Sequence, residues 1–246
     1  MTSSGKRDLI VLTAYCLLSG LGADSPPANA VRSYGSLRAM YHEGQTGEAV
    51  KLTGLFPDPQ LYALGALAGL TGEITVVGGR AYLSYPSGTA ETRTEITSAP
   101  TGGAALLVTA GVAQWRTMKA PRAIPFEELD QAIAALAAEA GIPSTERFPF
   151  LVEGEVERLE WHVIDGRRLP AGPTSHEAHL EASVRVSAAK ARATLVGFYS
   201  ESDQGVFTHH GSKTHVHCVV ESPLSSGHVD HVVIPAGTTI KLPVVR

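Results

Sequence analysis

The apolar residues of the first half fall into runs and alternations that predict several strands and one long helix. Residues 104–112 are almost continuously apolar, as expected for a strand buried in the middle of a sheet. Residues 73–77 and 80–84 flank a Gly-Gly pair and predict a hairpin. Residues 125–141 combine a helical pattern with a proline at the start and a glycine at the end, which are typical helix boundaries.

Shorter elements complete this pattern. We expect two short helices before the first strand, one over residues 37–42 capped by Ser36 and one over residues 46–52. His176 and His179 lie in a polar stretch that we interpret as a solvated loop. The second half otherwise contains strand patterns, which we place at residues 148–152, 156–164, 193–199, 211–221, 229–234 and 239–245.

These elements predict an α/β protein of the mixed α+β type. We expect two closely packed halves, each with a mainly antiparallel or mixed β-sheet. The polar stretch over residues 144–147 is the expected boundary. The chain is therefore divided into an N-terminal α/β half over residues 31–146 and a β-rich half over residues 147–246.

The composition is that of an ordinary globular protein, with 43% hydrophobic and 18% charged residues. A net charge of −4 and the lack of a basic stripe argue against nucleic acid as a partner. The two cysteines, Cys16 and Cys218, do not form a disulfide framework. We expect Cys218 to be a small buried residue rather than a nucleophile.

Residues 1–30 have the features of a secretory signal peptide. Lys6 and Arg7 precede an apolar run over residues 9–21, and Ala28-Asn29-Ala30 supplies a small-x-small cleavage pattern. An ordinary N-terminal core helix is the alternative interpretation. A cleaved signal predicts a secreted or periplasmic protein, and a retained N-terminus a cytoplasmic one. The apolar run is too short to span a bilayer comfortably, so we expect no membrane partner in the mature form.

Three histidines near the C-terminus provide the candidate chemistry. His215 and His217 are two residues apart in a predicted strand, so both rings are expected on one face. His228 returns after a short turn. Three imidazoles around an open position form the usual ligand set of a catalytic zinc site. A surface strand that is merely rich in histidine is the alternative.

Several short segments of the chain match one known family in their order and spacing. They are Gly69-Leu70-Thr71-Gly72-Glu73-Ile74, Thr194-Leu195-Val196-Gly197-Phe198-Tyr199-Ser200, His215-Val216-His217 and Gly227-His228-Val229. In this order they resemble the α-acetolactate decarboxylase family. The resemblance implies that His215, His217 and His228 hold zinc or another divalent transition metal, and that Glu73 reaches the same site. It also implies that the substrate is a 2-hydroxy-3-keto acid or a related small oxygenated molecule, with acetoin biosynthesis as the context.

Two features depart from the family pattern. Alignment of residues 153–162 places His162 where the family has a strand arginine that helps to hold the substrate. The sequence also offers no obvious equivalent of a late glutamate of the family. Imidazole cannot form the two-pronged pair with a carboxylate that guanidinium forms. We therefore expect His162 to be a weaker substrate contact, with weak or no activity on acetolactate itself.

Glu73 is the candidate for proton delivery. Loss of carbon dioxide leaves an enediolate, and a divalent cation can stabilise its negative charge as a Lewis acid. An acid must then protonate it, and a carboxyl group in a partly apolar site can be tuned for that task. A surface carboxylate at the start of a strand is the alternative. The expected partner is a small-molecule substrate, and a homodimer is left open.

Two other functions compete with this one. His215-x-His217 followed by Glu221 matches the start of the cupin metal motif, in which Glu221 would be a ligand and His228 would have no role. A non-catalytic metal-binding protein with a decarboxylase fold is the second alternative. His209, His210 and His231 are further histidines that the family pattern does not explain.

Overall fold

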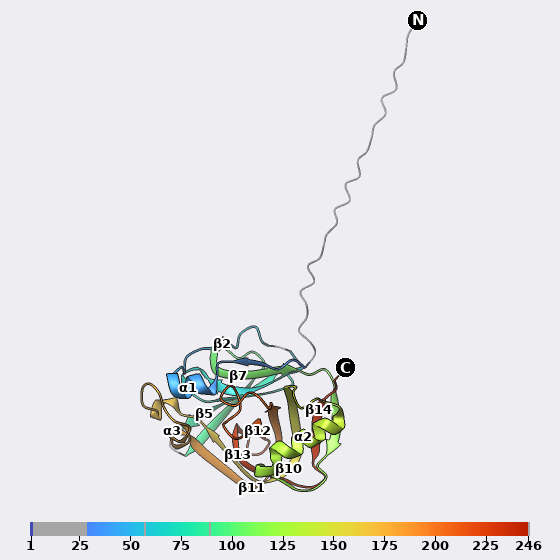
Figure 1. Cartoon of the computed structure of the whole chain (residues 1–246). Coiled ribbons are helices and arrows are strands. Elements are labelled where there is room, and N and C mark those ends of the chain that lie inside the picture. The colour runs from blue at the N-terminus through green and yellow to red at the C-terminus, as the bar shows by residue number, and fades with distance from the viewer. Residues whose placement is uncertain (2–28, 57, 89, 246) are drawn as a thin grey trace.

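The protein consists of two antiparallel β-sheets with few helices (Figure 1). This computed structural model describes Met1 and residues 29–245 except 57 and 89. The expected signal sequence and Cys16 therefore lie almost entirely outside the described residues. The predicted fold class, mixed α+β with two closely packed halves, is confirmed.

The first sheet has seven strands, and β7 is a buried interior strand between β1 and β3, as the continuous apolar run predicts. The predicted hairpin is also present, because β4 and β5 pair from Glu73↔Ser84 to Val77↔Arg80. The strands in sheet order are β1 (Arg32–Tyr34), β7 (Gly103–Gly111), β3 (Leu61–Leu67), β4 (Glu73–Val77), β5 (Arg80–Ser87) and β6 (Glu91–Thr97), with β2 (Val50–Lys51) paired to β7.

The second sheet also has seven strands, and four of them close on themselves. Strands β10 to β13 pair in sequence, and β13 pairs back with β10, which makes a small barrel. The strands in sheet order are β8 (Trp115–Lys119), β14 (Thr239–Pro243), β10 (Phe148–Val163), β11 (Val184–Tyr199), β12 (Thr214–Val220), β13 (Ser225–Ile234) and β9 (Ile124–Pro125).

The strands of the second half are longer than the sequence suggests. The two strands expected at 148–152 and 156–164 are one strand, β10, and β11 begins at Val184 rather than near residue 193. Gly154 lies between the two strands that the sequence predicts, and its φ is 141°. Pairing with β11 continues through it, so a glycine between two glutamates does not end the strand.

The chain changes sheet earlier than the boundary expected at residues 144–147. Strand β7 ends the first sheet at Gly111, and β8 already belongs to the second sheet. Residues 115–140 therefore accompany the second sheet, although the expected boundary places them in the first half. The separation of the chain into two domains at residue 146 stays a prediction.

In the described part of the chain, three α-helices flank the sheets. The first, α1 (Leu37–Glu43), begins at Ser36, whose hydroxyl accepts a hydrogen bond from the Ala39 amide as predicted. The second, α2 (Leu129–Ala140), ends at Gly141 as predicted. The helix expected over residues 46–52 is wrong, since that segment contains β2. The third, α3 (His176–Ala182), lies where a loop was expected. The chain also forms short 3₁₀ turns at η1 (Ala68–Leu70), η2 (Phe126–Glu128) and η3 (Gly166–Arg168).

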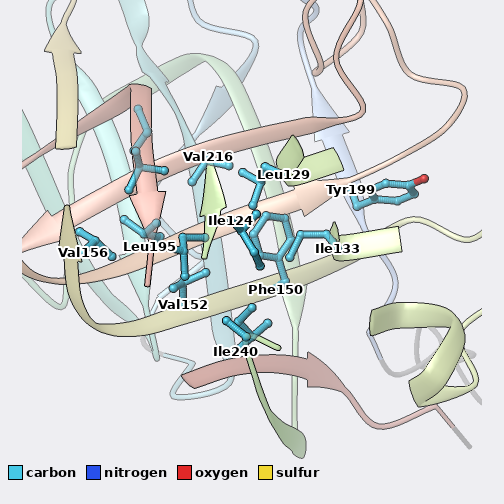
Figure 2. Close-up of a cluster of buried hydrophobic side chains, with 14 of the residues drawn as sticks. Ile124, Leu129, Ile133, Phe150, Val152, Val156, Leu195, Tyr199, Val216 and Ile240 are labelled. Atoms are coloured by element: carbon cyan, nitrogen blue, oxygen red, sulfur yellow. The ribbon is translucent and has the colours of Figure 1, made fainter. Parts of the chain in front are cut away.

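A large apolar core fills the second half (Figure 2). Leu129 and Ile133 of α2 pack there with Phe150, Leu195 and Val216 of the barrel strands. At the standard value of about 25 cal/mol per Å² of buried apolar surface, each such side chain contributes roughly 1.5–3 kcal/mol. The rigid barrel that results holds the strands that carry the histidines.

A smaller apolar cluster joins the two halves. It contains Leu64 and Val108 of the first sheet, Val196 and Phe198 of the second, and Phe207 of the segment between β11 and β12. Because these side chains are buried against each other, the faces of the two sheets have a fixed relation. Among the described residues, no helix is long and apolar enough to cross a membrane.

Candidate metal centre

The three predicted histidines converge on one point outside the barrel. His215 and His217 lie on β12, and His228 lies on β13 directly opposite His217. One nitrogen from each ring falls within 4.8 Å of those of the other two. The alternate residues Val216 and Cys218 point into the barrel core, so the two faces of β12 separate the apolar from the polar side chains.

Hydrogen bonds orient two of the three rings. Nδ1 of His215 donates to the carbonyl oxygen of Phe207 over 2.7 Å. Nδ1 of His217 lies 3.2 Å from the hydroxyl of Thr75, which in turn accepts a hydrogen bond from Ser226. A proton on each Nδ1 leaves the lone pair on Nε2. That is the tautomer a metal ligand needs, and Thr75 is a partner of the kind that fixes ligand orientation.

The ring of His228 shows whether a cation fits the site. Nδ1 of His228 is buried and has no hydrogen-bond partner within the described part of the chain. An unsatisfied buried ring nitrogen is costly unless an ion or a water meets it. The set of three neutral imidazoles is what zinc and similar transition metals prefer. The residues present therefore fit a divalent transition metal.

Burial keeps these histidines neutral. It lowers the pKa of His215 to about 4, although the hydrogen bond to Phe207 opposes the shift. The pKa values of His217 and His228 also lie well below the usual value, first because of burial and then because of neighbouring histidines. Neutral rings do not have to lose a proton before binding a cation.

Glu73 reaches the cluster from the other sheet. It begins β4, its side chain is buried, and its Oε2 lies 3.9 Å from Nε2 of His217. Its Oε1 accepts a hydrogen bond from the Ile164 amide. Burial raises the pKa of Glu73 to about 7, while the positive charge of His162 and the Ile164 bond lower it in part. The alternative of a surface carboxylate is wrong.

His162 lies beside the cluster but is already paired. Its ring packs edge-on against His228, with 4.8 Å between centroids. Its Nδ1 lies 2.7 Å from Oδ1 of Asp230. Burial disfavours its cation, but the hydrogen bond and charge of Asp230 and the charge of Glu73 outweigh burial, so the pKa of His162 is raised. Asp230 was missed, although it is two residues from His228 and so on the same face of β13.

Three further histidines extend the site, and two of them were expected to be solvated. His209 stacks on His228 at 5.3 Å, and His176 packs on His209 at 4.5 Å between centroids. His179 is buried, its Nε2 lies 2.7 Å from the Thr174 hydroxyl, and burial lowers its pKa to about 4. The expected loop is instead helix α3, which packs His179 against Tyr41, whereas His176 is exposed as expected.

The other unexplained histidines are not part of the cluster. His210 is exposed. His231 lies on β13 opposite Glu160 and near the ring of Phe126. Of His209, His210 and His231, only His209 therefore reaches the candidate site.

Two connected cavities surround the histidines. The inner cavity has a volume of about 50 Å³ and is lined by Glu73, His162, His215 and His228, with apolar side chains such as Leu106 opposite. The outer cleft has a volume of about 560 Å³. His176, Leu180, His209 and His228 line both, so they form the neck between cleft and cavity. The inner space suits a small molecule that combines oxygen atoms with short alkyl groups.

A known protein family matches most of the chain. The sequence profile described as alpha-acetolactate decarboxylase matches residues 61–245, which is most of the chain. The chain belongs to this family. The matched region includes Glu73, His162 and all three clustered histidines. No match is found among the curated proteins.

Solved structures show the same fold. The α-acetolactate decarboxylase of Bacillus subtilis strain 168 superposes with a TM-score of 0.69 at 17% identity, covering 88% of this chain and 86% of that chain. A Staphylococcus aureus protein of unknown function, described as similar to α-acetolactate decarboxylase, superposes with a TM-score of 0.65 at 13% identity over the same shares. Identities this low show the family fold alone.

The fold and the site exclude the cupin alternative. A cupin would use Glu221 as a ligand and leave His228 idle. Here Glu221 is exposed and pairs with Arg192, whereas His228 belongs to the cluster. The cupin motif in the sequence is therefore coincidental, because Glu221 lies outside the histidine cluster.

Proposed function

We propose that the protein is a zinc-dependent decarboxylase, a carbon–carbon lyase of the acetolactate decarboxylase type. The observation that carries this proposal is the convergence of His215, His217 and His228 beside the buried carboxyl group of Glu73. A three-histidine site leaves coordination positions for substrate oxygens, as in catalytic zinc sites. The substrate is a 2-hydroxy-3-keto acid small enough for the inner cavity.

The three histidines would hold the cation. When bound, a divalent cation supplies Lewis acidity, which lowers the cost of the negative charge that develops as carbon dioxide leaves. Thr75 and the Phe207 carbonyl hold two of the ligand rings in place through their Nδ1 atoms. The apolar wall of the inner cavity excludes water, which strengthens these electrostatic interactions.

Glu73 is the proposed proton donor. Its burial keeps a fraction of the carboxyl group protonated near neutral pH, with a pKa of about 7 before a cation is added. A general acid works best with a pKa near the working pH. The Ile164 amide holds Oε1, which leaves Oε2 facing His217 and the space where the reacting carbon would lie.

His162 is the second proposed contact for the substrate. Its pairing with Asp230 fixes the ring and assigns Nδ1 to that carboxylate. The remaining Nε2 can donate one hydrogen bond, which is less than the fork of an arginine offers a carboxylate. We therefore expect weak or no turnover of acetolactate itself.

The test is metal content followed by release of carbon dioxide. The purified protein should bind about one equivalent of zinc by elemental analysis, and His217→Ala should lose it while His210→Ala, an exposed histidine, should not. The loaded protein should release carbon dioxide from a panel of 2-hydroxy-3-keto acids with different alkyl groups. Stoichiometric zinc in His217→Ala would refute the ligand set. Bound zinc without release from any substrate would favour the non-catalytic metal-binding alternative.

The cellular location follows from the N-terminus. We propose that the apolar run over residues 9–21 directs export and that cleavage follows Ala30. The mass of the protein isolated from its natural source measures this directly. A chain that still begins at Met1 would place the enzyme in the cytoplasm.

A further inference from the structure

Arg185 lines the outer cleft and lies in one row with two histidines of the site across three strands. His228 on β13 pairs with His162 on β10, and His162 pairs with Arg185 on β11. Residues that are directly opposite in antiparallel strands project from the same face. Arg185 is therefore on the same face as the metal-ligand candidate His228, two strands away, at about 10 Å between Cα atoms.

Arg185 is the one Arg or Lys among the described residues that line the outer cleft. Within the described chain it makes no ion pair, although other exposed basic residues of β11 do, such as Lys190 with Glu155 and Arg192 with Glu221. Its charge still reaches the site, because it opposes protonation of His162. A guanidinium group without a carboxylate partner faces the route to the histidines.

The acidic residues of the cleft are arranged so that they do not neutralise Arg185. Asp230 is engaged by His162 through a 2.7 Å contact. Glu160 lies on the same face of β10 two residues from His162 and lines the cleft. Glu160 is the nearest remaining acidic group along that strand, and it should repel an incoming anion while Arg185 attracts it.

We propose that the outer cleft is a carboxylate-binding subsite and that Arg185 is the positioning residue that holds the carboxylate of the substrate. This inference rests on the proposed function, because it places the acid group of the same substrate whose oxygens face the three histidines. His162 cannot serve alone, since its Nδ1 belongs to Asp230. Arg185 supplies the planar donor fork that fits a carboxylate from the adjacent strand.

The experiment compares an acid with its neutral amide. The probes are a 2,3-dihydroxy-2-methyl acid, which cannot lose carbon dioxide as a keto acid does, and the corresponding carboxamide. Binding to the zinc-loaded full-length protein is measured by calorimetry, and zinc is counted in every sample. Arg185→Gln removes the charge at similar length. Arg192→Gln removes the same charge from the same strand outside the cleft and is the matched control.

The expected result is specific to one probe. Arg185→Gln should weaken binding of the acid on the order of tenfold, the size expected for one partly exposed charged hydrogen bond. It should leave binding of the amide and the zinc content unchanged. Glu160→Gln should shift binding of the acid in the opposite direction, because it removes a competing negative charge. Arg192→Gln should change neither probe.

Three results would overturn the inference. Equal weakening of the acid by Arg185→Gln and Arg192→Gln would show only a long-range charge effect. Equal loss of acid and amide in Arg185→Gln would show a structural role. An unchanged affinity for the acid in Arg185→Gln, with zinc present and both probes bound, would refute the role of Arg185 and leave the proposed decarboxylase intact. If neither probe binds the zinc-loaded wild-type protein, the proposed function itself is refuted.

Discussion

At the scale of single residues, chemistry depends on how burial and partners change each titratable group. Glu73 and His162 both lie beside the three histidines, yet their neighbours differ. Glu73 is buried, which favours its neutral form, although the hydrogen bond from the Ile164 amide partly opposes this effect. His162 meets Asp230, which favours its cation. Burial therefore raises the pKa of the carboxyl group, while a neighbouring carboxylate raises the pKa of the imidazole.

The first prediction concerns Glu73. Glu73→Gln keeps the size and the hydrogen bond from Ile164 but removes the transferable proton. We expect zinc content to be retained and carbon dioxide release to fall by about 10²–10⁴-fold, the usual contribution of a general acid. Glu155→Gln, an exposed glutamate paired with Lys190, is the control. A loss of less than a few-fold in Glu73→Gln would remove Glu73 from the chemistry.

At the scale of elements, the alternation of β12 sorts its residues between the barrel core and the site. Its neighbour β13 returns His228 and Asp230 to the same face. Strand β4 of the other sheet then closes the site, since it contributes both Glu73 and Thr75. A contact between two strands of different sheets therefore determines the orientation of a proposed ligand.

The second prediction tests that contact. Thr75→Val preserves shape but removes the acceptor for Nδ1 of His217 and the partner of Ser226. Loss of such a supporting hydrogen bond commonly weakens metal binding by about 10–100-fold. Competition with a zinc chelator measures the affinity. Thr94→Val, which removes the hydroxyl pair with Ser84 elsewhere in the first sheet, should leave zinc affinity unchanged. Equal affinities in wild type and Thr75→Val would contradict the prediction.

At the scale of the whole molecule, the buried histidines link folding to pH. Burial lowers the pKa of His179 to about 4, of His215 to about 4 and of His209 to about 2, below the value of 6.5 for an exposed ring. The unfolded chain therefore binds more protons than the folded one between these values. The free energy of unfolding is therefore highest, as far as these histidines are concerned, above pH 6.5. It decreases as the pH falls towards 4, because the unfolded chain takes up protons that the folded chain does not. Glu73 and His162 act in the opposite sense, since their pKa values are raised.

The third prediction follows from that balance. The histidines with lowered pKa outnumber the two groups with raised pKa, so the metal-free protein should melt at a lower temperature at pH 5 than at pH 7.5. Each buried histidine contributes at most about 1.4 kcal/mol per pH unit. His209→Phe keeps an aromatic ring in the stack and should flatten the dependence of Tm on pH. Parallel profiles for wild type and His209→Phe would show that His209 does not titrate on unfolding.

Much of the site could be read from the sequence because its pattern is local. The spacing of His215 and His217 determines that they share a face, and the strand period of two residues is independent of the rest of the fold. The helix ending at Gly141, the hairpin that begins at Glu73 and the buried strand at residues 104–112 are likewise encoded in short stretches. The order of such stretches also sufficed to indicate the family.

Only the tertiary structure decided which distant residues meet the histidines. Thr75 contacts His217 across 142 positions of sequence, and Asp230 reaches His162 across 68. His179 on helix α3 and His209 in the loop before β12 were misread or left unexplained, because other parts of the chain pack against their rings. Such contacts depend on how two sheets pack and on the register of paired strands. Local hydrophobic periodicity carries no information about either, and so Arg185 beside His162 became apparent only in the folded barrel.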